Sequence, residues 1–142
     1  MEYIDICTPG GTLYVLDKFG IKARKKYGQN FLIDSNIVRK IISAAGITKA
    51  DCVLEIGPGI GTMTGMLSEA AGHVVAVEID ESLRQVLTET LAGRDNIDII
   101  WNDVLKTDLR EIADRHNGGR PMKVVANLPY YVTTPIIMKL LK

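Results

Sequence analysis

Short apolar runs alternate with amphipathic stretches along most of this chain, and the alternation constrains the fold more than any other feature. Four runs have the length of buried strands, at residues 51–57, 73–80, 97–101 and 122–127. Helical patterns occupy residues 34–46, 62–71, 81–92 and 108–116, and another helix should follow Thr134 with Pro135 at its first position. This order predicts an α/β fold, a Rossmann-like, doubly wound parallel sheet with helices on both faces. We expect the strand order 3-2-1-4, with ligands at the carboxyl ends of the strands.

Local signals predict where the helices begin and end. Asp34 or Ser35, Asp80 and Thr107 are the expected N-caps, and Gly72 is an expected helix stop. The first helical pattern should turn one apolar face to the core, made of Ile37, Ile41, Ile42 and Ala45.

Composition restricts the class of protein. The chain has 142 residues, the size of one domain, and no run of about 18 apolar residues that would predict a membrane span. It also lacks the apolar core of a secretory signal, and residues 1–11 read as a poorly ordered start. Cys7 and Cys52 are too few for a disulfide framework, which indicates a reducing, cytoplasmic compartment. His73 and His116 stand alone without metal-ligand spacing, so we expect surface histidines and no metal.

Charge is distributed unevenly, although the formal net charge is zero. Between residues 18 and 40, a single acid, Asp34, stands among seven bases: Lys18, Lys22, Arg24, Lys25, Lys26, Arg39 and Lys40. This asymmetry suggests an arm or face for polyanions, with a solvated charged loop as the alternative.

A glycine-rich loop, EIGPGIGT at residues 55–62, follows the first predicted strand and opens a helix. Gly57, Gly59 and Gly61 allow a tight turn and a close approach of the backbone to a ligand. The free N–H groups of the helix behind them favour a polar ligand. A glycine-rich loop indicates a ligand site when a strand precedes it and a helix follows it, as here. A purely structural turn is the alternative.

Acidic residues follow the next two predicted strands. Glu78 ends the second strand, 21 residues after Gly57, where a carboxylate accepts hydrogen bonds from both ribose hydroxyls. Asp80 is expected to cap the next helix, which leaves Glu78 for the ribose. Asp103 follows the third strand and is placed to accept from the exocyclic amine of adenine. Loop, ribose acceptor and adenine acceptor together predict a cofactor that carries adenosine.

NAD and S-adenosylmethionine both carry adenosine. The dinucleotide fingerprint has glycine or alanine at its sixth position, where this chain has Thr62. Glu55, next to the loop, suits the amino acid tail and sulfonium of S-adenosylmethionine. The glycine pattern therefore favours S-adenosylmethionine slightly and leaves NAD open.

The fourth predicted strand runs into NLPY at residues 127–130. If the reaction is methyl transfer to an adenine amine, two acceptors that grip its hydrogens would expose the nitrogen lone pair and stabilise developing positive charge. The side-chain oxygen of Asn127 and the carbonyl of Leu128 are the candidates. Pro129 would stiffen the turn, and Tyr130 would stack on the flipped base. A turn with buried aromatics is the structural alternative.

NLPY, EIGPGIGT and above all KKYGQNFLID at residues 25–34 resemble the ribosomal RNA adenine dimethyltransferase family, in its bacterial small-subunit, kasugamycin-resistance type. The resemblance implies a class I S-adenosylmethionine-dependent methyltransferase that dimethylates two adjacent adenines of small-subunit (16S) ribosomal RNA. It implies that residues 1–33 are an arm with a cofactor lid, and it assigns the following roles. The cofactor contacts would be Gln29, Asn30, Leu32, Gly57, Glu78, Asp103 and Asn127, the base grip Asn127, Leu128, Pro129 and Tyr130, and the RNA contacts Lys22, Arg24, Lys25 and Lys26.

The resemblance also implies more protein than this chain contains. The family's sheet has seven strands and is followed by a helical domain, so residues 34–142 correspond to a partial domain truncated after the fourth strand and its helix. We expect weak or no turnover from this fragment and self-association through the edge of the fourth strand. A ribosome-assembly module with a residual cofactor site is the alternative from another class, and DNA adenine methylation is the alternative within the enzymes.

Overall fold

The computed structural model of this chain describes residues 9–21 and 34–126. In chain order the elements are α1 (Pro9–Lys18), α2 (Ser35–Ala45), β1 (Cys52–Ile56), α3 (Thr62–Ala70), β2 (His73–Glu78), the 3-10 helix η2 (Glu81–Leu83), α4 (Arg84–Thr90), β3 (Ile97–Trp101), the 3-10 helix η3 (Val104–Lys106), α5 (Leu109–Asn117) and β4 (Lys123–Ala126). None of the helices in the described residues is long and apolar enough to cross a bilayer.

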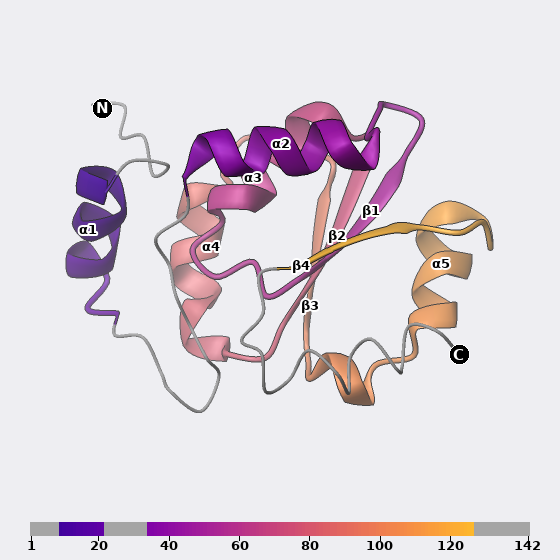
Figure 1. The fold of residues 1–142 in the computed structure, drawn as a ribbon. Coiled ribbons are helices and arrows are strands. Elements are labelled where there is room, and N and C mark those ends of the chain that lie inside the picture. The colour runs from indigo at the N-terminus through magenta and orange to yellow at the C-terminus, as the bar shows by residue number, and fades with distance from the viewer. Residues whose placement is uncertain (1–8, 22–33, 127–142) are drawn as a thin grey trace.

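The four strands form one parallel sheet in the order β3-β2-β1-β4, as the sequence predicts (Figure 1). The register pairs Ile56, the last residue of β1, with both Val77 and Ala126. It also pairs Glu78 with Trp101, the last residues of β2 and β3. All four carboxyl ends therefore meet at one edge of the sheet.

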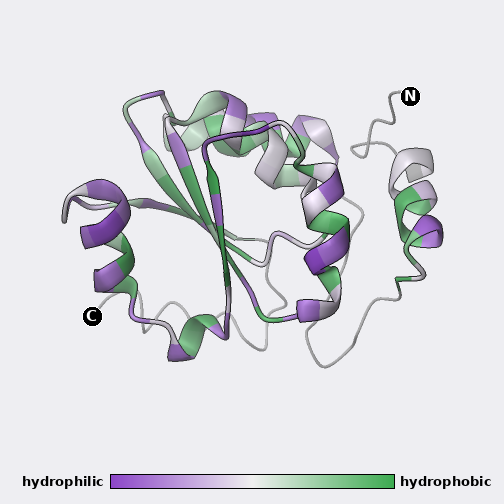
Figure 2. Ribbon diagram, turned by 180° about the vertical axis from the view of Figure 1, so that it is seen from behind, coloured by the Kyte–Doolittle hydropathy of each residue, from purple (hydrophilic) through white to green (hydrophobic). Residues whose placement is uncertain are grey.

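Helices cover both faces of the sheet, with α2 and α3 on one side and α5 on the other (Figure 1). On the first side Val53 and Val74 pack with Val38 of α2 and Leu67 of α3. On the second side one cluster joins the strands to Ile112 of α5, with Leu54 and Val75 among its members. This double cover explains why β1 is buried along its whole length and why hydrophobic residues predominate in the strands, with one or two polar residues in each (Figure 2).

Helix α1 is absent from the sequence prediction, which treats residues 1–33 as an arm with a poorly ordered start up to Gly11. The structure begins this helix at Pro9, a residue suited to the first helical position. Val15 is 6% exposed and packs with Ile60, Leu83 and Leu87. Burial against the rest of the domain thus stabilises a short helix whose two early glycines weaken the local signal.

The cap predictions are mostly confirmed. Asp34 caps α2 by accepting from the N–H of Asn36 at 2.8 Å, and Asp80 caps η2 through Ser82 at 3.0 Å. The prediction of Thr107 as the N-cap of α5 is wrong. Asp108 caps this helix and accepts from the N–H of Glu111 at 3.1 Å.

The predicted apolar face of α2 is confirmed only in part. Val38 is fully buried, whereas Ile37 is 56% exposed and Ala45 is exposed. Ile41 and Ile42 pack against the cluster as partly buried residues. The core-facing residues of α2 therefore begin at Val38 and not at its neighbour Ile37.

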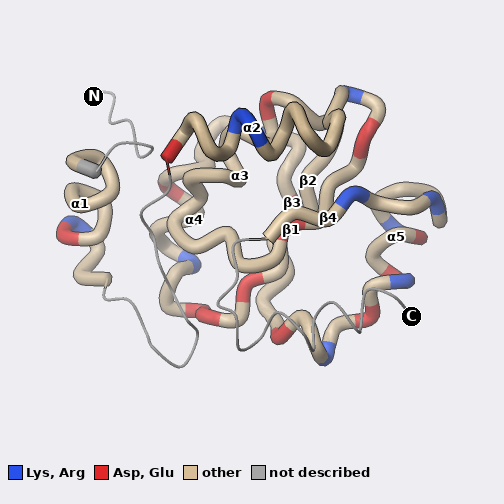
Figure 3. The backbone as a smooth tube through the Cα atoms, in the orientation of Figure 1, with Lys and Arg blue, Asp and Glu red and all other residues tan. Residues whose placement is uncertain are grey.

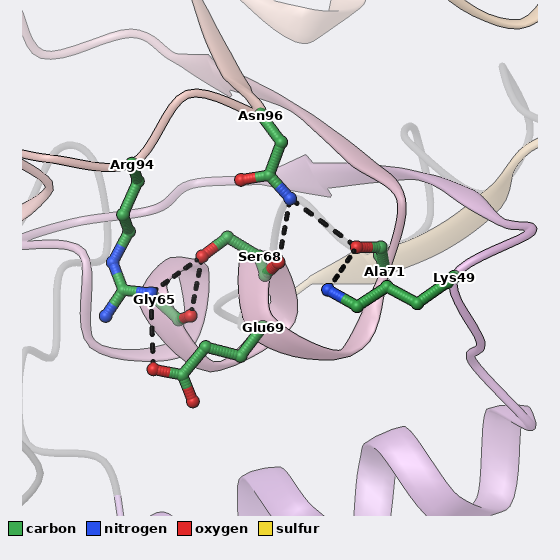
Figure 4. A network of polar contacts seen from close by, with 7 residues as sticks. All are labelled: Lys49, Gly65, Ser68, Glu69, Ala71, Arg94 and Asn96. Carbon is green, nitrogen blue, oxygen red and sulfur yellow. Dashed lines mark hydrogen bonds and ion pairs between the residues drawn. The ribbon is translucent and has the colours of Figure 1, made fainter.

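Polar side chains, rather than a left-handed glycine, close the C-terminal end of α3 (Figure 4). The side-chain amide of Asn96 donates to the carbonyl of Ser68 at 2.7 Å and to that of Ala71 at 3.5 Å. Lys49 donates to the same Ala71 carbonyl at 3.3 Å. Gly72 is needed here for space, because a Cβ on it would lie 2.3 Å from the carbonyl oxygen of Lys49.

Strand β4 lies at one edge of the described sheet, where it pairs with β1. Val124 on this edge strand is 41% exposed. Self-association through this edge stays a prediction.

Gly72→Ala should lower the free energy of unfolding by about 1–3 kcal/mol, because the added methyl group forces the backbone at Lys49 to shift. Urea denaturation measures the change. Gly10→Ala is the matched control, since a Cβ there meets nothing within 4 Å and alanine favours a helix. Equal stabilities for the two variants would contradict the steric argument.

Candidate functional site

The turn from β1 into α3 depends on three glycines with left-handed backbone. Gly57, Gly59 and Gly61 have φ values of 74°, 61° and 91°, which other residues rarely adopt. A Cβ on Gly61 would lie 2.9 Å from the Thr90 hydroxyl oxygen, whereas a Cβ on Gly57 would meet nothing within 4 Å. Gly61 therefore serves packing against α4, and Gly57 leaves open space at the end of β1 where a ligand could approach.

The loop is held from behind by α4. The hydroxyl of Thr90 donates to the carbonyl of Ile60 at 2.8 Å, and the Ile60 side chain is 1% exposed among apolar residues of α4. At the start of α3, the N-cap Gly61 provides no side-chain cap. The loop is thus fixed in place while the first N–H groups of α3 have no side-chain acceptor at the cap position.

Glu55 is a carboxyl group inside the sheet, 1% exposed, and one of its oxygens accepts a hydrogen bond from the Thr64 hydroxyl. Its other oxygen, Oε2, and the hydroxyl of Thr62 are buried with no hydrogen-bond partner among the described residues. Burial raises the pKa of Glu55 to about 8, the Thr64 hydrogen bond opposes this shift, and Glu78 adds to it. A cationic group placed beside Glu55 would reverse the shift and supply the missing partner.

Glu78 connects the end of β2 to the glycine loop. It is 4% exposed, and its two oxygens accept from the N–H of Gly59 and the N–H of Asp80, each at 3.0 Å. Burial raises the pKa of Glu78, and the backbone hydrogen bonds from Asp80 and Gly59 oppose the shift. Asp80 caps η2 as expected, but Glu78 is not left without partners. A carboxylate has about four acceptor positions, so it retains capacity for ligand hydroxyls.

The end of β3 lies beside this carboxylate. The N–H of Asn102 donates to the backbone carbonyl of Glu78 at 3.0 Å. Asp103 is partly exposed and accepts from the N–H of Leu105 at 2.9 Å, so it caps η3. The guanidinium carbon of Arg84 lies 4.5 Å from the centre of the Trp101 ring. Acidic residues thus recur along the edge where β2 and β3 end (Figure 3).

The structure brings six predicted cofactor residues to this edge of the sheet: Glu55, Gly57, Gly59, Gly61, Glu78 and Asp103. The remaining site predictions lie outside the described residues: Lys22, Arg24, Lys25, Lys26, Gln29, Asn30, Leu32, Asn127, Leu128, Pro129 and Tyr130. Asn127 follows Ala126 directly in the sequence, and Ala126 pairs with Ile56, the residue before Gly57.

Sequence reasoning missed the hydroxyl groups that support the loop. The Thr64 hydroxyl donates to Glu55, and the Thr90 hydroxyl donates to the backbone of the loop. Thr64 lies two residues after Thr62, the last residue of the glycine motif, so its position was a usable signal. Thr90 is 30 residues from its partner Ile60, and nothing local predicts that contact.

Glu55→Gln should flatten the dependence of stability on pH. The pKa of Glu55 is about 8 in the fold against an ordinary 4.5, so the folded state binds more protons between these values. The free energy of unfolding of the parent chain should therefore fall, by up to several kcal/mol, as pH rises from about 5 to about 8. Glutamine does not titrate, so this part of the slope disappears.

Urea denaturation at a series of pH values measures the slope. Glu69→Gln is the matched control on α3, because the Glu69 side chain is 69% exposed and should leave the slope of the parent chain intact. If Glu55→Gln kept the full slope, the buried carboxyl group would not be its source.

Two curated relatives match nearly the whole chain. The chain is 57% identical over 133 residues to a ribosomal RNA small subunit methyltransferase A from Lachnoclostridium phytofermentans, covering 93% of this chain and 46% of the relative. It is 50% identical over 142 residues to the protein of the same name from Leuconostoc citreum, covering 99% of this chain and 48% of the relative. The chain thus spans about half the length of the curated relatives it matches.

Solved structures with the same fold agree with these matches. A dimethyladenosine transferase from Plasmodium falciparum superposes with a TM-score of 0.61 at 31% identity, covering 76% of this chain and 37% of that one. The 23S rRNA methyltransferase ErmE gives a TM-score of 0.63 at 31% identity, covering 77% of this chain and 41% of that one. The four-stranded sheet described above is therefore part of a Rossmann-like methyltransferase fold.

The model of one family, described as ribosomal RNA adenine dimethylase, matches residues 20–142. That match includes the glycine loop and all four strands whose ends form the candidate site. The chain belongs to the ribosomal RNA adenine dimethylase family.

Proposed function

We propose that the protein to which this chain belongs dimethylates the N6 amines of two adjacent adenines in small-subunit ribosomal RNA, with S-adenosylmethionine as methyl donor. One observation carries the proposal: the glycine loop, Glu78 and Asp103 lie at the single edge of the sheet where β4 also ends. Relatives named ribosomal RNA small subunit methyltransferase A support the choice of substrate.

The residues at this edge fit S-adenosylmethionine, which supplies a methyl group activated by its bond to a positively charged sulfur. Glu55 has a buried oxygen without a partner among the described residues, and its raised pKa is what a nearby cation would lower. Gly57 leaves the room that a ligand needs. Glu78 and Asp103 would accept hydrogen bonds from ribose hydroxyls and an adenine amine.

Two residues of the glycine loop region, Glu55 and Thr62, disfavour a dinucleotide cofactor. A buried carboxyl group beside the loop would repel a pyrophosphate if it ionised, and Thr62 occupies the sixth position of the fingerprint, where glycine or alanine is usual. The cofactor proposal therefore depends on Glu55 as well as on the glycines.

Asn127 and Leu128 would hold the target amine. Acceptance of both amine hydrogens, by the Asn127 side chain and the Leu128 carbonyl, exposes the nitrogen lone pair and stabilises positive charge as the new bond forms. Pro129 would restrict the turn, and Tyr130 would stack on the extruded base. No strong general base is needed, because the product ammonium loses its proton to water.

The basic residues Lys22, Arg24, Lys25 and Lys26 would contact RNA phosphates, an interaction that weakens as salt rises. A ribosomal RNA substrate would place the protein in the cytoplasm.

Glu78→Gln should weaken S-adenosylmethionine binding at least about tenfold, or about 1.4 kcal/mol, because an amide lacks the charge and lone pairs that two ribose hydroxyls require. Isothermal titration of the chain with S-adenosylmethionine and with NAD measures this. Glu81→Gln is the matched control, because Glu81 follows the same strand end three residues after Glu78 and its side chain is 68% exposed. NAD binding without S-adenosylmethionine binding would sink the cofactor proposal.

Asn127→Ala, made in the longer protein that contains this chain, should reduce methyl transfer to small-subunit RNA at least about 100-fold, since one acceptor for the amine is lost. Transfer of labelled methyl groups to unmethylated small subunits measures the rate, and thermal melting should be unchanged. Asn36→Ala on the exposed surface of α2 is the control. Full activity of Asn127→Ala would remove the proposed grip on the amine.

A further inference from the structure

Three potential metal ligands converge at the edge of the sheet opposite the glycine loop. His73 is the first residue of β2, Asp98 lies near the start of β3, and His116 lies near the end of α5. His73 and Glu78 are opposite ends of the same strand, about 16 Å apart at the usual rise per residue. This cluster is therefore separate from the candidate cofactor site.

The topology explains why these residues meet. Asp98 pairs with Val75, and alternation along β2 places His73 on the same face as Val75. Val75 packs with Ile112 on the face that α5 covers, and Ile112 is one helical turn before His116. Each ligand is thus attached to an element that the buried core holds in place.

The distances between the donor atoms are short. His73 Nε2 lies 2.8 Å from Asp98 Oδ2, and His116 Nδ1 lies 3.6 Å from the same oxygen. One donor atom from each residue lies within 4.8 Å of the others, and the imidazole rings are stacked with centroids 5.6 Å apart. The side chains of His73, Asp98 and His116 are 29%, 54% and 17% exposed, so an ion could enter from solvent.

These distances approach those of a tetrahedral zinc site. Bonds of about 2.0 Å to an ion place neighbouring ligand atoms about 3.3 Å apart. The two distances to Asp98 Oδ2 lie on either side of that value, so small side-chain rotations would suffice for them. Two imidazoles and one carboxylate are ligands that zinc, cobalt and nickel accept, whereas magnesium and calcium prefer oxygen alone.

We propose that His73, Asp98 and His116 bind a divalent transition-metal ion of the zinc type, with water completing the coordination. The ion joins β2, β3 and α5 at the end of the domain remote from the glycine loop. Because it binds the folded arrangement, it stabilises the packing of α5 on the sheet.

Titration of the chain with zinc chloride, followed by calorimetry and by thermal melting, tests the proposal. We expect one ion per chain and a melting temperature that rises with zinc. His73→Gln and His116→Gln should each weaken binding at least about tenfold and reduce the rise in melting temperature. Asp95→Asn is the matched control, an exposed acid three residues before Asp98 that lies outside the group and should bind zinc as the parent chain does.

Melting without zinc shows whether each variant is folded, and either histidine variant suffices if the other fails to fold. Absence of zinc binding by the parent chain would overturn the proposal. So would a folded histidine variant that binds zinc as tightly as the parent chain, because the ion would then be held by other residues. Magnesium chloride should produce neither heat nor a shift in melting temperature, and equal binding of magnesium and zinc would also overturn it.

Discussion

The parallel pairing of β1 with a strand on each side is the constraint on which the rest of this molecule depends. β2 and β4 both run in the direction of β1, and β3 runs in the direction of β2, so the residues that follow all four strands emerge at one edge. Parallel neighbours require crossover connections, and the helices in those connections cover both faces of the sheet. The convergence of the glycine loop with Glu78 and Asp103 is a direct result of this topology.

Two buried carboxyl groups lie at this edge of the sheet. Glu55 and Glu78 are both nearly inaccessible, and burial raises the pKa of each. Glu78 is compensated by two backbone hydrogen bonds, whereas Glu55 has one hydroxyl partner and one oxygen without a partner among the described residues. Stability alone would favour an apolar residue at position 55. The cost is understandable if the carboxyl group serves a ligand.

Sequence patterns predicted the strands well, because strands covered on both faces read as continuous apolar runs. The prediction for β3 matches the structure at both ends, whereas that for β1 is one residue too long at each end and that for β2 ends two residues too late. The prediction for β4 begins one residue too early, and its last residue, Asn127, lies outside the described residues. Adjacent alternatives caused the local errors: Thr107 and Asp108 both suit an N-cap, and Ile37 and Val38 are both apolar. Helix α1 was missed because its contacts are tertiary rather than local.

The candidate site was likewise predicted only in part from the sequence. Topology alone predicts which acids reach the edge, since it depends only on where strands end. The partners of Glu55 and Glu78 depend on side-chain rotamers, which a sequence pattern does not encode. The expectation that His73 and His116 stand alone on the surface is wrong, because both are partly buried and their rings stack on each other. The sequence hides this cluster since His73, Asp98 and His116 are far apart in the chain, and only the crossovers bring them together.

The strand order also determines when β1 can gain both of its neighbours during synthesis. Val53 of the central strand pairs with Lys123, which leaves the ribosome 70 residues later. One side of β1 therefore stays without its partner until most of the chain has been translated, even after β2 and β3 have emerged. A strand with one unpaired side can pair with another chain, so the nascent chain exposes an edge for aggregation in the interval before β4 is made.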